Sequence, residues 1–308
     1  MGDFLSGSWD VLTTPGLYGT LVRLSVFLMF AAVGEWVAER SGTLNISVEG
    51  MALVGAFAAV VGSDVASSVV GGLVFGAGAG VLVALVQANL SHRLTANQFV
   101  VGLALNVLAV GLTTFLAAQT DFEVTPAGHF PAADRLPGVL SNIFDQRWTA
   151  YLIIPAVLTC GWLVLRTRWG LEVRAVGENP QAADVSGVHV NKRRREAILV
   201  CGAMAGLAGS FISLDSPGFS SNMTSGRGFI AIAAVIFGGW TLRGTIAGCL
   251  LFAGVEAVQV NVQGLQLDVN RQLLFALPYI VTLVVMAVFA KRTRQPRALA
   301  QPFVRGLT

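Results

Sequence analysis

Charged side chains are scarce in this sequence. Only 12% of its 308 residues are Asp, Glu, Lys or Arg, whereas a soluble domain carries about a quarter. Hydrophobic residues make up 54% of the chain, and the mean hydropathy is +0.70. This composition predicts an integral membrane protein in contact with lipid, and we expect no nucleic-acid binding despite the net charge of +3.

Residue types that carry catalysis are also few. The only lysines, Lys192 and Lys291, are each followed by Arg, so the Gly-Lys-Ser/Thr sequence of a phosphate-binding loop is lacking. The three histidines and three cysteines lie far apart, without a CxxC pair or the spacing of a metal site. We expect no catalytic residue, no metal site and no cofactor on this chain, and we interpret the cysteines as small packing residues.

Long apolar stretches are plentiful. A hydrocarbon core about 30 Å thick needs roughly 20 apolar residues per helix, or fewer where a broken helix is buried by its neighbours. Nine stretches predict an all-α, polytopic membrane protein whose residues 1–308 form a single transmembrane domain. Their expected ranges are 21–37, 48–61, 65–90, 99–118, 148–165, 197–214, 228–238, 244–260 and 273–290.

The distribution of positive charge predicts the orientation. Lys and Arg favour cytoplasmic loops, and one orientation places 15 of the 20 inside and 5 outside. The N-terminus is then outside and the C-terminus in the cytoplasm of a bacterial cytoplasmic membrane. Segment 119–147 becomes an extracytoplasmic loop and segment 166–196 a cytoplasmic loop. Residues 1–19 contain no basic residue, so we expect an outer-surface segment rather than a cleaved signal peptide.

The cytoplasmic loop contains a helix signal. Pro180 follows Asn179 at a position suited to a first helical turn, and Gly187 can end the helix about two turns later. Such a helix between basic flanks is either a docking site for a cytoplasmic protein or only a determinant of orientation.

Spans 1–4 resemble spans 6–9 in order. Each set has an ordinary span, a loop rich in Ser, Asn and Gly, a short Gly-bounded stretch and two further spans. A shift of five spans reverses direction in the membrane, so the halves are predicted to be an inverted repeat. Transporters have this architecture, and their short, broken helices mark the pathway near the midplane. The GxxxG pairs at 76–80, 202–206 and 244–248 are interpreted as helix-packing sites.

Polar residues in or beside the short spans are the pathway candidates, because ionisable groups in a membrane are costly. Glu49 and Arg227 open the two short spans and could form a polar lining or an ion pair across the halves. Each candidate could equally be a structural tie for broken-helix backbone. The candidates are Asn45, Ser47, Glu49, Asn222, Arg227, Phe229 and Glu256, with Glu35 as a further acid inside a predicted span.

Three blocks carry a resemblance to a known family. They read GEWVAERSGTLNISVEGMALVGAF, RAVGENPQAADVSGVHV and SGRGFIAIAAVIFGGW. Over residues 34–289 the chain resembles the permeases of ATP-binding cassette (ABC) importers for ribose-type sugars and nucleosides, most closely the shorter permease of the nucleoside branch. The resemblance implies three partners: a cytoplasmic ATPase that binds ATP and Mg²⁺, a second homologous permease and an extracytoplasmic substrate-binding protein.

The resemblance also implies a coupling segment at residues 179–187. It maps onto Asn179, Pro180, Ala182, Ala183 and Gly187, where related importers keep small residues that enter a cleft of the ATPase. We expect nucleosides as substrate, with simple sugars as the alternative. Two other classes stay open from the residues alone: an ion-coupled secondary carrier, and a membrane scaffold that does not transport.

The charge distribution generates a first prediction. Single cysteines at Ser186 and Pro131, in a background without Cys160, Cys201 and Cys249, should label from opposite sides of the membrane. Impermeant thiol reagents applied to intact cells and to inverted vesicles measure this. Labelling of both positions from the same side would contradict the predicted topology.

Overall fold

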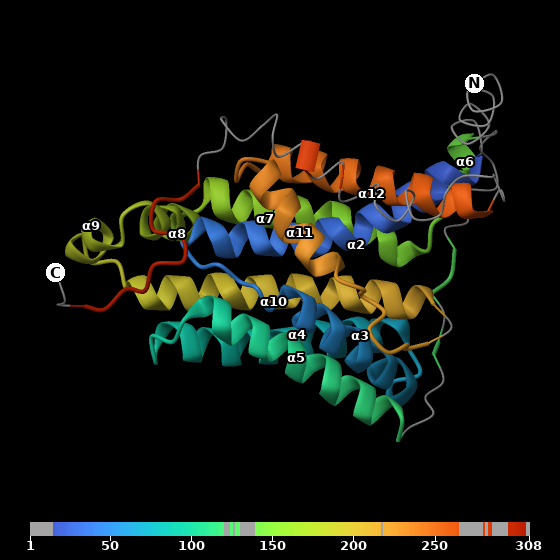
Figure 1. Cartoon of the computed structure of the whole chain (residues 1–308), viewed down its shortest axis with the longest axis horizontal. Helices are drawn as coiled ribbons and strands as arrows, with labels where there is room; N and C mark the ends of the chain where they lie inside the picture. The colour runs from blue at the N-terminus through green and yellow to red at the C-terminus, as the bar shows by residue number, and fades with distance from the viewer. Residues whose placement is uncertain are drawn as a thin grey trace.

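The computed structural model describes residues 15–119, 124–125, 127–129, 139–216, 218–264, 280, 283–284 and 295–305. Within them the chain is almost entirely helical (Figure 1). The helices are α2 (Pro15–Arg40), α3 (Val48–Val65), α4 (Val69–His92), α5 (Gln98–Ala117), α6 (Val139–Phe144), η2 (Trp148–Leu152), α7 (Ile153–Arg166), α8 (Arg168–Glu178), α9 (Pro180–Val185), α10 (Val190–Asp215), α11 (Arg227–Phe237) and α12 (Leu242–Gly264).

The predicted polytopic α-helical fold is confirmed. Seven helices in the described part of the chain are long and apolar enough to cross a membrane, and α11 is a shorter apolar helix. These eight helices correspond to the first eight predicted spans. The ninth, 273–290, lies almost wholly outside the described residues, so the total of nine stays a prediction.

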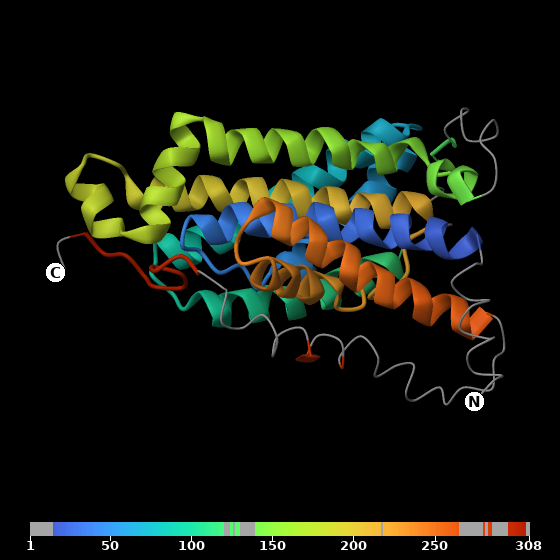
Figure 2. The ribbon, with the colours of Figure 1, turned by 90° about the horizontal axis from the view of Figure 1, so that it is seen from above.

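Two long helices, α2 and α10, run side by side through the middle of the bundle (Figures 1 and 2). Helices α3 and α4 pack on each other and on α10. In the same way, α11 and α12 pack on each other and on α2. Exchanging α2, α3 and α4 for α10, α11 and α12 therefore reproduces the same set of contacts, as expected for the first three pairs of the inverted repeat.

Glycine allows the helices around α10 to approach closely. A Cβ on Gly80 of α4 would lie 2.1 Å from the carbonyl oxygen of Gly202, and one on Gly55 of α3 would lie 2.6 Å from the Cα of Gly206. Lipid provides no hydrophobic drive for helix association, so close van der Waals packing of this kind holds a membrane bundle together. The interpretation of the GxxxG pairs as packing sites is confirmed at this crossing.

The segment between α7 and α10 is more helical than predicted. The expected loop 166–196 contains α8 and α9, and α10 already begins at Val190. Figure 2 shows α8 and α9 beyond one end of the long helices, with the described C-terminal segment 295–305 beside them. We call this end of the molecule the α9 end. The long helices α2 and α10 run between the α9 end and the opposite end, where α2 begins and α10 finishes.

A matched pair of substitutions on α4 tests the close packing. Gly80→Val should destabilise the protein by about 1–3 kcal/mol, because its side chain meets backbone that cannot move aside. Gly78→Val is the control, since nothing lies within 4 Å of a Cβ at Gly78. Thermal unfolding in detergent measures the difference, and equal midpoints for the two variants would contradict the packing.

Candidate functional site

The first turns of α3 and α11 meet inside the bundle. The carboxylate of Glu49, in the first turn of α3, accepts hydrogen bonds from the backbone N–H groups of Gly226 (2.7 Å) and Gly228 (2.6 Å). It also accepts one from the hydroxyl of Thr224 (2.6 Å). The first N–H groups of a helix have no partner within that helix, and lipid offers none. Glu49 supplies these partners, and its negative charge suits a helix N-terminus.

The backbone before α11 is shaped for this contact. Asn222, Ser225 and Gly226 all have left-handed φ angles, of 57°, 48° and 81°. They reverse the chain so that α11 begins against α3. A Cβ on Gly228 would lie 2.7 Å from the Cα of Glu49, so the approach requires glycine at that position.

The contact between α3 and α11 lies near the middle depth of the bundle. Asn106, near the midpoint of α5, accepts from the N–H of Gly50 (2.8 Å) and donates to the carbonyl of Ile46 (2.9 Å). Glu256, in the interior of α12, binds Arg227. Helices α3 and α11 therefore begin well away from both ends of the long helices, as the broken helices of transporters do.

Arg227 forms its ion pair with Glu256. Its Nη2 and Nε atoms lie 2.7 Å and 2.9 Å from Oε1 of Glu256, and the two side chains are 20% and 19% exposed. Of the two possibilities for Glu49 and Arg227, the ion pair between them is not formed in this structure. Both side chains belong to one polar cluster, in which Glu49 holds backbone and Arg227 holds Glu256.

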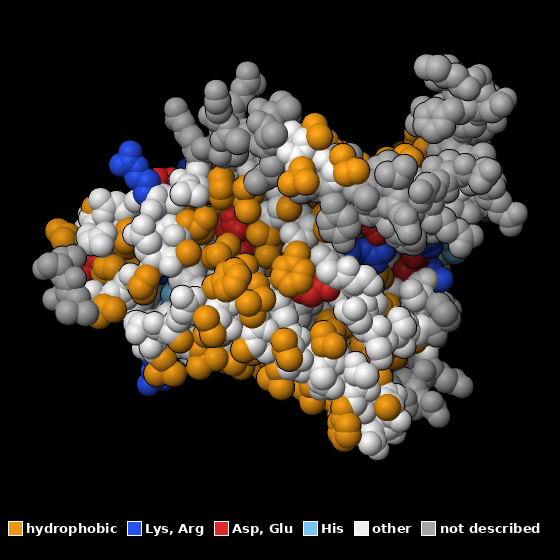
Figure 3. Space-filling model, in the orientation of Figure 1, with side chains coloured by type: hydrophobic (Ala, Val, Ile, Leu, Met, Phe, Trp, Pro, Cys, Tyr) orange, Lys and Arg blue, Asp and Glu red, His pale blue; other side chains and the backbone are white. Residues whose placement is uncertain are grey.

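The other pathway candidates divide into exposed and buried groups. Asn222 is exposed, and so is Phe229, whose exposed fraction is 43%. Asn45 and Ser47 are completely buried. The Oδ1 atom of Asn45 accepts from the hydroxyl (2.7 Å) and N–H (3.2 Å) of Ser47, so this pair braces the segment between α2 and α3. Figure 3 shows the face that carries α11, where acidic side chains interrupt a largely hydrophobic surface.

A second buried network lies between this site and the α9 end. Glu35 of α2 accepts from the N–H of Asn45 (3.0 Å), and the indole of Trp240 donates to Glu39. The indole of Trp36 donates to the carbonyl of Trp240 (2.8 Å). The contacts of Glu35 with the chain favour a structural role. Sequence reasoning missed Glu39 and Trp240, because their pairing spans 201 residues and no local pattern signals it.

Helix α9 begins and ends as the sequence predicts. The side chain of Asn179 accepts from the N–H of Ala182 (3.0 Å), and Pro180 occupies the first turn. Gly187 follows the helix with a φ of +88°. A cap, a first-turn proline and a left-handed glycine are local signals, so they define this short helix without tertiary information.

The two alanines of α9 face different ways. Ala182 is exposed, whereas Ala183 is 5% exposed and packs with Val176 and Val190 of its own chain. Val185 is 90% exposed. Of these residues, Ala182 and Val185 can therefore contact another protein, while the small size of Ala183 fits α9 onto α8 and α10.

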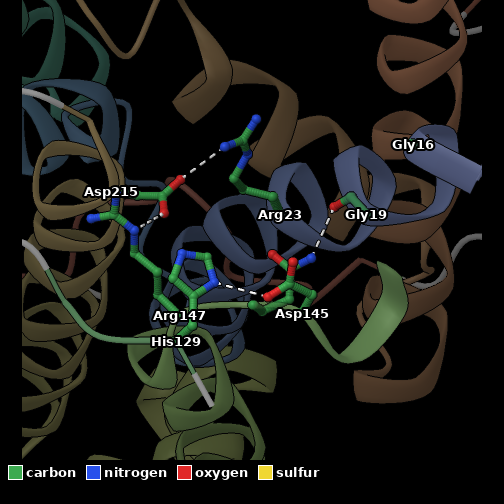
Figure 4. Close-up of a pocket in the computed structure, with 8 residues that line it drawn as sticks. Gly16, Gly19, Arg23, His129, Asp145, Arg147 and Asp215 are labelled. Carbon is green, nitrogen blue, oxygen red and sulfur yellow. Dashed lines mark hydrogen bonds and ion pairs between the residues drawn. The ribbon is translucent and has the colours of Figure 1, made fainter. Parts of the chain in front are cut away.

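The opposite end of the bundle carries a charged cavity of about 250 Å³ (Figure 4). Asp215 of α10 binds Arg23 of α2 (3.3 Å) and Arg147 (3.1 Å). His129 binds Asp145 (2.9 Å) on the same rim. Charges of both signs thus gather at the end remote from α9, in a position open to solvent.

Two helices that begin at mid-depth, a set of helix contacts that repeats between the two halves and a small helix beyond the bundle are typical of a membrane transport protein. The chain belongs to the family described as branched-chain amino acid transport system / permease component, whose model matches residues 17–289. It is thus a membrane permease subunit of an ABC transporter.

Three curated relatives match between 79% and 95% of this chain. A putative glucose ABC transporter permease protein of Haloferax volcanii, TsgC13, is 35% identical over 95% of this chain and 98% of its own. Two guanosine ABC transporter permease proteins of Bacillus subtilis also match. NupQ is 33% identical over 91% of this chain and 93% of its own, and NupP is 30% identical over 79% and 73%.

The Glu49 contact generates a prediction. Glu49→Ala should lower the unfolding temperature and the transport rate, because three donors lose their acceptor, and each buried donor left unpaired costs about 1–3 kcal/mol. Asp64→Ala, at the exposed last turn of the same helix, is the control. Thermal unfolding in detergent measures the effect. If both variants unfold at the wild-type temperature, Glu49 does not hold α11.

Proposed function

We propose that this chain is a permease of an ABC importer that carries nucleosides across the bacterial cytoplasmic membrane. The observation that carries the proposal is the charge balance of the mid-depth site. Arg227 is paired with Glu256, and Glu49 is held by the first turn of α11. A site whose ions are compensated within the protein suits a neutral solute better than an ionic one.

The exposed groups at this site fit the chemistry of a nucleoside. Asn222 and Ser225 offer an amide and a hydroxyl for a ribose, and the exposed ring of Phe229 offers an apolar face for a base. Nearby, Phe57 and Phe219 contact edge to face, with ring centroids 5.5 Å apart. The two guanosine relatives support the same substrate class. Simple sugars are the second candidate, favoured by the putative glucose relative.

The two ends of the molecule support two of the proposed partners, a cytoplasmic ATPase and a substrate-binding protein. Helix α9 lies beyond the membrane helices with Ala182 and Val185 exposed, and it is the proposed contact for a cytoplasmic ATPase that binds ATP and Mg²⁺. This assigns the C-terminus to the cytoplasm and the N-terminus to the outside. The charged cavity at the opposite end then faces the substrate-binding protein.

A second, homologous permease completes the proposed transporter. Bacillus subtilis has two different proteins named guanosine ABC transporter permease, NupQ and NupP, and this chain is similar to both. This favours a heterodimer. An ion-coupled carrier has less support, because it needs a mid-depth carboxylate whose charge is free to bind the ion, whereas Glu49 accepts three hydrogen bonds and the charge of Glu256 is paired with that of Arg227.

Uptake in cells with the complete transporter tests the proposal. Deleting this chain should abolish uptake of labelled guanosine or adenosine and leave ribose and glucose uptake unchanged, because the nucleoside pathway has lost one permease. ATP depletion with the ion gradients clamped should also abolish nucleoside uptake. Loss of sugar uptake alone would contradict the nucleoside assignment, and uptake that survives ATP depletion would contradict the ABC mechanism.

A further inference from the structure

The C-terminal segment 296–305 is bound across the α9 end by its own backbone. The N–H of Ala298 donates to the carbonyl of Gly177 at the end of α8 (2.9 Å). The N–H of Ala300 donates to the carbonyl of Gly42, just after α2 (3.0 Å). A segment distant in sequence thus joins the ends of two other elements (Figure 2).

Arg194 of α10 holds the same region from inside. It is completely buried, and its guanidinium donates to the carbonyls of Ser41 (3.2 Å), Ala298 (3.4 Å) and Gln301 (2.6 Å). Burying a guanidinium is costly unless its donors are satisfied. The planar guanidinium has several N–H donors and can bind carbonyls in several directions at once, which the single ammonium group of a lysine cannot do. Arg194 therefore fixes the C-terminal segment and the start of the α2–α3 loop together.

The far end of the segment supports α9. Phe303 packs on the cluster of Val176, Ala183 and Val190, and Arg305 lies 3.2 Å from Asp184 of α9. A six-residue helix is not stable alone, so α9 owes its position to these neighbours.

Two valines are exposed at this junction, although it lies beyond the membrane helices. Val304 is 41% exposed and Val185 of α9 is 90% exposed. Val304 precedes Arg305 and Val185 follows Asp184, and these two charged residues form an ion pair, so the two exposed valines lie on neighbouring stretches of backbone. Exposed apolar groups rimmed by charge are typical of a contact with another protein.

We propose that segment 296–305 completes the ATPase docking surface begun by α9, and that Arg194 is the positioning residue that joins this surface to the α2–α3 loop. The inference rests on the proposed function, since it takes α9 as the ATPase contact. The α2–α3 loop carries Asn45 and Ser47 and leads directly into α3. A movement of the docking surface therefore also moves the first turn of α3, which carries Glu49.

The first test measures how much ATPase co-purifies with the tagged permease from membranes that contain the complete transporter. Val304→Asp should reduce the recovered ATPase at least tenfold, as should Val185→Asp in α9. Val65→Asp is the matched control, because it makes the same change at a valine that is 69% exposed at the end of α3, outside both α9 and segment 296–305. Membrane levels and unfolding temperatures should be unchanged in all three variants.

The possible outcomes separate the two proposals. Full ATPase recovery with Val304→Asp, in a preparation where Val185→Asp loses the ATPase, overturns this inference and leaves the proposed function standing. A wild-type chain that recovers no ATPase overturns the proposed function and this inference with it.

The second test addresses Arg194 through the coupling of hydrolysis to transport. Arg194→Lys keeps the charge but cannot reach three carbonyls. It should retain at least half of the wild-type ATPase recovery while nucleoside moved per ATP hydrolysed falls at least fivefold. Lys192→Ala, on the same helix, should leave that ratio unchanged. An unchanged ratio in Arg194→Lys overturns the positioning role.

Discussion

A helix that begins inside the hydrocarbon layer exposes backbone N–H groups that lipid cannot satisfy, and the arrangement of the bundle follows from this constraint. α11 begins in this way, and Glu49 satisfies its first turn. The carboxylate can do so only if α3 stands in one register against α11. The glycine contacts of α3 with α10, such as that of Gly55 with Gly206, secure this register. Dense packing and the buried carboxylate of Glu49 thus act together.

Backbone carbonyls are satisfied by the opposite charge. Arg194 donates to three carbonyls at the α9 end, and Arg147 donates to the carbonyl of Leu214 (2.6 Å) where α10 finishes. Most of the buried charge described here therefore stabilises interrupted backbone rather than solute. Among the described residues, the accessible groups at mid-depth include a compensated ion pair, an amide, a hydroxyl and a phenyl ring. That combination favours an uncharged, polar solute with a flat face.

Local signals in the sequence were enough to predict where α9 begins and ends, because its cap, proline and glycine each act within a few residues. The charged sequence of α8 was interpreted as a loop, although Thr167 caps its first turn by accepting from the N–H of Gly170 (3.0 Å), and the helix packs on α7 and α10. The spacing of the short spans identified Glu49 but not its partner, which lies 177 residues away at Gly226. The orientation of Ala183 toward its own chain likewise depends on Val176 and Val190, which a small-residue motif does not reveal.

Hydrogen bonds connect the mid-depth site with the α9 end through one network of buried groups. From the α9 end, Arg194 holds the carbonyl of Ser41, and Asn45 of the same loop binds Glu35 and braces Ser47 at the start of α3. On the other half, the carbonyl of Trp240 accepts from α2. A network connected in this way resists internal rearrangement, because each broken bond leaves a buried group unpaired. In the proposed transporter, rocking the whole chain against the second permease would break fewer of these bonds than opening a path within the chain.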